Sequence, residues 1–153
     1  MATIDHTYVS AAVEGRLGDG LDGSDVAFVR SGDPEPDGES AWCRLVAVDV
    51  MPEGRNRSTG NDTARVNVAV NVAVGAGQQN AHAIANALAV VGRVLDEWTD
   101  DDSATTGHLI ELDRAETRRD PEPFENPEIR TGSVIATGRV QRPTGVAFLD
   151  VLT

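Results

Sequence analysis

The chain contains no lysine, a single cysteine and few aromatic residues. All of its 13 basic residues are arginines, and they stand against 25 acidic residues, which gives a formal net charge of −12. One cysteine, Cys43, excludes an internal disulfide and a cysteine-based zinc site. Because Cys43 lies in an apolar, strand-like segment, we expect it to be a buried small hydrophobic residue rather than a nucleophile.

Two further absences concern membranes and nucleic acids. No apolar run approaches the roughly 20 residues of a membrane-spanning helix, and the chain does not begin with a basic and then apolar secretory signal. We therefore expect a protein made and used in a cytoplasm, with no membrane partner. Generic binding of nucleic acid needs a basic surface, and the acidic charge of this chain argues against it.

The acidic excess has its own interpretation. A GC-rich genome would explain the missing lysine, but it does not explain 15 aspartates among 153 residues. An acidic, lysine-free chain with only 4% aromatic residues resembles proteins of salt-in halophilic archaea. Molar salt shortens the screening length to about 3 Å and so removes most of the self-repulsion of such a chain.

Residues 64–98 carry the clearest structural pattern. Every second residue from Val66 to Val74 is valine, and this period of two predicts a strand with one apolar face. Apolar residues then recur at spacings of three and four, which predicts an amphipathic helix over about 78–98. A helix that returns across the valine face of its own strand would form a rigid core without an obvious reactive group.

The rest of the chain predicts a single domain, 1–153, of the α+β class. We expect a mainly antiparallel sheet of four to five strands, with one long helix (about 78–98) packed on one face and a short N-terminal helix. The expected short helix is 5–17, and the expected strands are 41–50, 66–74, 108–117 and 133–142, with 145–153 as a possible last strand.

The second face of the valine strand consists of Asn67, Ala69, Asn71 and Ala73. These small and polar residues could pack flat against another backbone in an oligomer. They are equally compatible with the solvent-facing side of an antiparallel sheet.

Two long polar loops are expected at 51–63 and 118–132, where compact domains prefer connections of about 4–6 residues. Both are rich in arginine, whose guanidinium fork binds carboxylates bidentately. We therefore predict that these loops contact a neighbouring subunit. The candidate interface residues are Arg55, Arg57, Arg118, Arg119 and Arg130.

Motifs for chemistry are incomplete. Gly75 and Gly77 begin a dinucleotide fingerprint, but Asn80 stands where its third glycine or alanine belongs. Asp100–Asp102 begin a calcium-loop pattern that lacks its central ligand and glycine, so a solvated acidic cluster at the helix end is expected. The three histidines share no metal-ligand spacing. The sequence therefore predicts no catalytic residue, no metal site and no cofactor.

The element order resembles the tail terminator and tail-completion proteins of long-tailed viruses. The segments that carry this resemblance are RLVAVDVMPEG, TARVNVAVNVAVGAGQQNAHAIANALAVVGRVL and HLIELDRAETRRDPEPFENPEIRTGSVIATGRVQRPTG, within residues 1–145. The glycine- and aspartate-rich segment 18–40 departs from typical members of that family.

The resemblance implies a structural virion protein rather than an enzyme. It implies a homo-oligomeric ring, usually a hexamer, on the head-proximal end of the tail tube, assembled in the host cytoplasm. Its partners would be the tail-tube protein and a neck or head-completion protein, and DNA would only pass through the lumen. Two alternatives stay open: another neck or tail ring subunit, such as a head-completion stopper or tail-tube protein, and a non-viral halophilic α+β domain that binds a ligand or partner.

Overall fold

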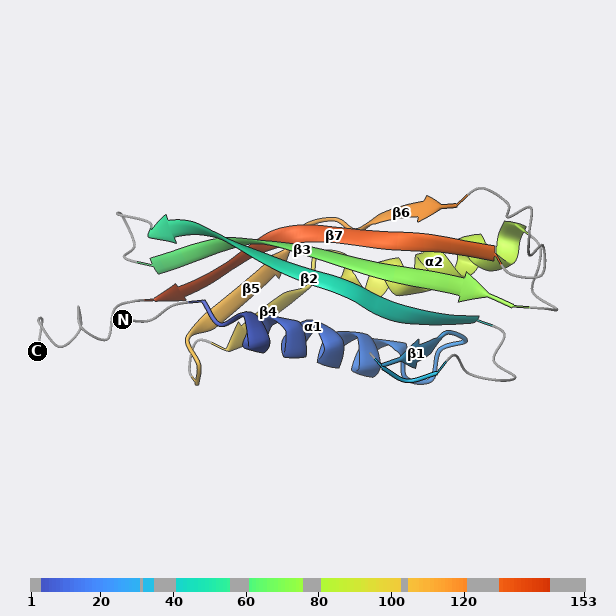
Figure 1. Cartoon of the computed structure of the whole chain (residues 1–153), viewed down its shortest axis with the longest axis horizontal. Helices are drawn as coiled ribbons and strands as arrows, with labels where there is room; N and C mark the ends of the chain where they lie inside the picture. The colour runs from blue at the N-terminus through green and yellow to red at the C-terminus, as the bar shows by residue number, and fades with distance from the viewer. Residues whose placement is uncertain are drawn as a thin grey trace, which may run out of the picture.

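The computed structural model describes residues 4–30, 32–34, 41–55, 61–75, 81–102, 105–120 and 130–143. Two helices and seven strands follow one another along these residues (Figure 1). They are α1 (His6–Leu21), β1 (Ala27–Val29), β2 (Ala41–Arg55), β3 (Asn61–Val74), α2 (Ala81–Leu95), β4 (Thr99–Asp102), β5 (His108–Leu112), β6 (Glu116–Arg119) and β7 (Arg130–Pro143). The strands form one sheet in the order β1-β2-β3-β7-β5-β4, and β6 pairs with β7.

The sheet is centred on β3, the valine strand. The side chains of Val66, Val68, Val70, Val72 and Val74 are at most 1% exposed, so the predicted apolar face is the core face. On either side β3 pairs antiparallel with β2 and β7, and its register with β7 is unbroken from Asn61 to Val74. The period of two in the sequence therefore predicted both the strand and its buried side.

The hairpin of β2 and β3 is longer than the sequence suggested. The expected loop 51–63 is mostly strand, because β2 continues to Arg55 and β3 begins at Asn61. Register shifts occur between Leu45 and Ala47 and between Pro52 and Gly54, so β2 continues past its proline by bulging. In Figure 1, β2, β3 and β7 run along the length of the molecule.

The helix α1 is longer than the predicted 5–17. Its buried residues are Val9, Val13, Leu17 and Leu21, one helical turn apart, and this stripe holds the helix together through three glycines. A side chain at Gly20 would place its Cβ 2.5 Å from Val94 Cγ1, so that glycine lets α1 approach α2 closely. Ile4, Tyr8 and Ala12 also pack against the core, whereas Ala11 is exposed.

The helix α2 packs on the valine face, as predicted, against β3 and β7. Its described residues end at Leu95, three residues before the predicted end. Glu97 has a φ of 53°, and its N–H donates to the carbonyl of Asp113, which turns the chain out of the helix. The predicted start at about 78 lies outside the described residues.

The sheet has more strands than the expected four to five, and one pair is parallel. β1 pairs parallel with β2, and the acidic segment expected as a helix-end cluster is instead the edge strand β4. The single strand expected at 108–117 is divided into β5 and β6, which pair with different ends of β7. The possible strand at 145–153 lies outside the described residues. No helix within the described ranges is long and apolar enough to cross a membrane.

Candidate subunit interface on the open sheet face

Both helices pack on the valine side of the sheet, and no described helix or strand covers its other side. We call this other side the open face. Its residues alternate with the core residues along the three long strands. They are Trp42, Arg44, Ala47, Asp49 and Met51 on β2, Arg65, Asn67, Ala69, Asn71 and Ala73 on β3, and Thr131, Ser133, Ile135, Thr137 and Arg139 on β7.

The middle of the open face is small and apolar. Ala47, Ala69 and Ile135 lie directly opposite one another across β2, β3 and β7. Ile135 is 39% exposed, and Val46, at the bulge beside Ala47, is 56% exposed. Met51 is the third large hydrophobic residue exposed in the described chain. An apolar centre surrounded by polar residues is the usual arrangement of a protein–protein interface.

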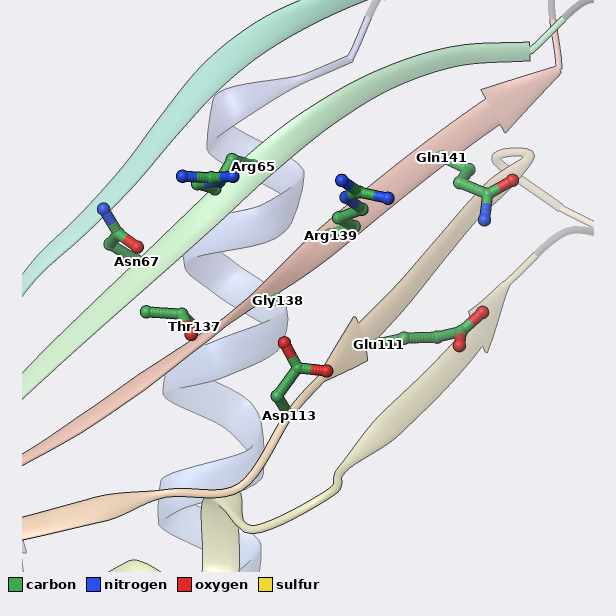
Figure 2. A pocket seen from close by; sticks show the side chains of 8 residues that line it. All are labelled: Arg65, Asn67, Glu111, Asp113, Thr137, Gly138, Arg139 and Gln141. Carbon is green, nitrogen blue, oxygen red and sulfur yellow. The ribbon is translucent and has the colours of Figure 1, made fainter. Parts of the chain in front are cut away.

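Towards the tip of the hairpin, the open face is hollowed into a polar depression of about 610 Å³ (Figure 2). Its lining comes from β3, β5, β7 and the residues after β5. The lining residues are Arg65, Asn67, Glu111, Asp113, Thr137, Gly138, Arg139 and Gln141. Figure 2 shows these side chains on the side of the sheet opposite α1. Two arginines and two carboxylates give the depression mixed charge in a chain that is otherwise strongly acidic.

The arginines of the depression differ in their partners. Arg139 forms an ion pair with Glu53, with Nε and Oε1 3.4 Å apart, and lies opposite Glu111 in the sheet. Arg65 lies directly opposite Arg139 and makes no hydrogen bond or ion pair within the described residues. At the other end of the face, Arg44 donates from Nη2 to the carbonyl of Asp33.

The structure separates the five arginines predicted from the loops. Arg118 and Arg119 are exposed on β6, and Arg130 begins β7, so these three share one end of the sheet. Arg55 ends β2 opposite Asp62, at the other end, and Arg57 lies outside the described residues. About 12 residues of β3, or roughly 40 Å, divide the two ends. These arginines therefore do not form one cluster, and their role as an interface stays a prediction.

A buried polar network, which the sequence did not reveal, joins α1 to the sheet edge. His108 is 1% exposed, and its Nε2 accepts the N–H of Asp5 at 3.2 Å. Its Nδ1 lies 3.0 Å from the hydroxyl of Thr106, which in turn donates to Asp102 at 2.7 Å. Burial, together with the positive charge of Arg142, lowers the pKa of His108. The histidine is therefore a neutral structural group.

Cys43 and Gly75, which the sequence marked as candidates for chemistry, both lie in the buried part of the fold. Cys43 is fully buried, as predicted, and burial raises the pKa of its thiol to about 12. Gly75 is buried directly after β3, whereas Gly77 and Asn80 lie outside the described residues. Within the described ranges, no group of three or more histidine, cysteine or acidic side chains is placed to hold a metal ion.

The sequence predicted which residues of β3 lie on the open face, but it did not predict the depression. Alternation placed Asn67, Ala69, Asn71 and Ala73 on the face opposite the valines, and this is where they lie. Arg65 and Arg139 are 74 positions apart, and only the register between β3 and β7 makes them neighbours. Strand periodicity assigns a face to each residue, but it does not assign a partner.

The sequence matches no protein-family model and no curated protein. Two solved structures are similar in fold. A chain described as "Virion of native gene transfer agent (GTA) particle" is 17% identical, with 82% of this chain and 84% of that chain covered and a TM-score of 0.49. A second solved chain, whose description states no function, is 14% identical, with 92% and 96% covered and a TM-score of 0.52. At these identities the likeness concerns the fold alone, and the lower TM-score is too small to carry the virion description over to this chain.

Proposed function

We propose that this chain is a structural protein of a tailed virus, and within the particle the tail terminator that caps the head-proximal end of the tail tube. One observation carries the proposal: the order of the elements. A helix precedes a strand pair, the second strand leads to a long helix, and later strands return to the sheet beside the first pair. This order is the one on which the family resemblance of the sequence rests.

The physical character of the fold supports a structural role. Strands of 14 and 15 residues, with a fully buried valine core, make a stiff slab about 46 Å long. Its open face is large, has an apolar centre and has no described covering within the chain. Such a part suits an assembly in which each subunit is held by its neighbours.

The charge of the chain fits the same role. A ring around a DNA path must let a polyanion slide, and acidic walls repel phosphates instead of binding them. The aspartate-rich composition further suits a particle that assembles in molar salt, so we propose a halophilic archaeal host for the virus.

The proposal is tested on particles of the virus that encodes the chain. Gold-labelled antibodies against the chain should mark a single position between head and tail. Particles made without the chain should carry free tubes of uncontrolled length and unattached heads, and supplying the chain should restore joined particles.

Three outcomes would contradict the terminator assignment. Label along the whole tail would make the chain a tube subunit, and label retained on tail-free heads would make it a head-completion stopper. Normal particles in the absence of the chain would place it outside the virion and favour a host binding domain.

A further inference from the structure

The depression on the open face contains an unfavourable charge pair. Arg65 on β3 and Arg139 on β7 are directly opposite each other, with no residue between them (Figure 2). Like charges at directly opposed positions of neighbouring strands destabilise a sheet. Glu53 forms an ion pair with Arg139, and Glu111 and Asp113 also line the depression, but Arg65 makes no hydrogen bond or ion pair within the described residues. The guanidinium of Arg65 is therefore exposed and available for an external carboxylate.

A complementary surface lies on the opposite side of the same molecule. Asp19, Asp22 and Asp25 are exposed at the C-terminal end of α1, and their carboxylates make no hydrogen bond or ion pair within the described residues. The last turn of α1 holds no basic residue. Negative side chains at this end oppose the helix dipole, so an external cation would be favourable here.

These two surfaces cannot meet within one chain. The helix α1 packs on the valine side of the sheet, while Arg65 and Arg139 face away from it (Figure 2). A contact between them requires two molecules. Because it would join different patches, it would be a heterologous contact, which repeats from copy to copy and closes into a ring when the rotation allows.

We propose that the depression around Arg65 and Arg139 receives the acidic end of α1 from a second copy of this chain. A carboxylate between the two guanidinium groups would replace like-charge repulsion with charge-assisted hydrogen bonds. The same contact would give the aspartates at the end of α1 a cationic partner, which the last turn of their own helix lacks. The inference rests on the proposed ring and extends it by naming the two surfaces that join neighbouring subunits.

The size and composition of the open face favour a protein partner over a small ligand. Three strands of about 14 residues cover roughly 650 Å², close to the about 800 Å² that each partner contributes to a stable interface. The exposed side chains of Val46, Met51 and Ile135 supply apolar contact beside the arginines. Arginine is enriched at interfaces, and Arg44, Arg65 and Arg139 lie on this face.

The test is a charge exchange between two variants of the full chain. One variant carries Arg65→Glu and Arg139→Glu, and the other carries Asp19→Arg, Asp22→Arg and Asp25→Arg. We expect wild-type chain at about 0.5 M salt to sediment as an oligomer, each variant alone to associate at least about tenfold more weakly, and an equimolar mixture to recover association. Arg65→Gln is a milder substitution that should weaken association to a smaller extent.

Arg93→Glu is the control, because Arg93 is exposed on α2 and undergoes the same substitution at a single site. It should leave association at the wild-type level, and thermal unfolding should show that every variant folds. A wild-type chain that stays monomeric at millimolar concentration would overturn the inference. Undiminished association of the Arg65 and Arg139 variant would overturn it as well, as would an equal loss in the control.

Failure of this inference is distinguishable from failure of the proposed function. A monomer that antibodies nevertheless place between head and tail would remove the contact and leave the terminator role intact. If association depends on the exchanged charges as expected but virus particles lack the chain, the contact would be supported and the terminator role contradicted.

Discussion

Tyr8 of α1 lies flat against His108 of β5, with the ring centroids 4.3 Å apart and the ring planes inclined by 15°. The Tyr8 hydroxyl donates to Asp100 on β4 at 2.7 Å, and His108 accepts the N–H of Asp5, 103 positions away in sequence. The two rings thereby attach the start of α1 to the edge of the sheet. They join the first helix to strands that form much later in the chain.

Replacing Tyr8 with phenylalanine separates the two parts of this attachment. Tyr8→Phe keeps the ring contact and removes the hydrogen bond to the Asp100 carboxylate, so it should lower the free energy of unfolding by about 1–2 kcal/mol. Chemical denaturation at neutral pH measures the change. Ser10→Ala, two residues along the same helix, should change stability by less than about 0.5 kcal/mol. Equal losses in the two variants would show that the hydroxyl contributes nothing specific.

The buried histidine predicts a pH dependence of stability. The pKa of His108 is lower in the folded chain than its ordinary 6.5, because burial and Arg142 disfavour the charged form more than the carboxylates of Asp5, Asp100 and Asp102 favour it. The unfolded chain therefore binds the extra proton first, and stability falls as the pH drops below about 6.5, until the folded histidine titrates too.

His108→Gln retains an acceptor for the Asp5 N–H without a titrating ring. Its stability should fall less than that of the wild type between about pH 7.5 and about pH 5.5, as followed by melting temperature. Parallel curves for the two proteins would contradict the assignment of this slope to His108.

Gly138 should be intolerant of any side chain. It lies opposite Leu112 of β5, and an added Cβ would overlap the carbonyl oxygen of Glu111 and lie 2.7 Å from Leu112 Cα. Because these are backbone atoms, β5 would have to move away, and Gly138→Ala should cost about 3 kcal/mol or more.

Gly15→Ala is the control for this substitution, since no atom lies within 4 Å of the added Cβ. It should stabilise the chain by up to about 1 kcal/mol, the difference in helix propensity between glycine and alanine. Thermal unfolding of both variants tests the pair. A Gly138→Ala protein as stable as the wild type would mean that β5 and β7 are packed less closely than the structure has them.

The thiol of Cys43 should be chemically silent in the folded chain. It is fully buried, and burial raises its pKa to about 12, so both access and the thiolate fraction are low at neutral pH. Reaction with a disulfide reagent should be at least about 100-fold slower in the native protein than in denaturant. Val46→Cys combined with Cys43→Ala gives a thiol on the exposed bulge and should react at once. Fast native labelling of Cys43 would indicate that β1, β2 and α1 separate readily.

Much of the core could be read from the sequence, because its signals are local. The alternation from Val66 to Val74 predicted a strand and its buried side, and the change to a spacing of three and four predicted α2. The predicted α+β class, with a helix on the valine face, is confirmed. The number of strands was underestimated, because short edge strands such as β4 and β6 are polar and are held in place by pairing with their neighbours.

The loops were the least predictable part. A proline, a glycine and charged residues suggested an irregular segment at 51–63, yet bulges let β2 continue along β3 to Arg55. Likewise Arg118 and Arg119 pair with β7 instead of lying in a loop. In both cases a long neighbouring strand supplied hydrogen-bond partners, and tertiary pairing outweighed local preference.

The sequence by itself determined which residues are buried along β3, the presence of a helix after it, the acidic character of the chain and the absence of a recognisable catalytic motif. Only the tertiary structure decided which residues face one another. Residue periodicity assigns a side to each side chain, whereas register depends on the pairing of distant strands. That pairing placed Arg65 opposite Arg139 on the open face and buried His108 against Tyr8, because the backbone hydrogen bonds of β3, β5 and β7 admit one alignment of their core residues.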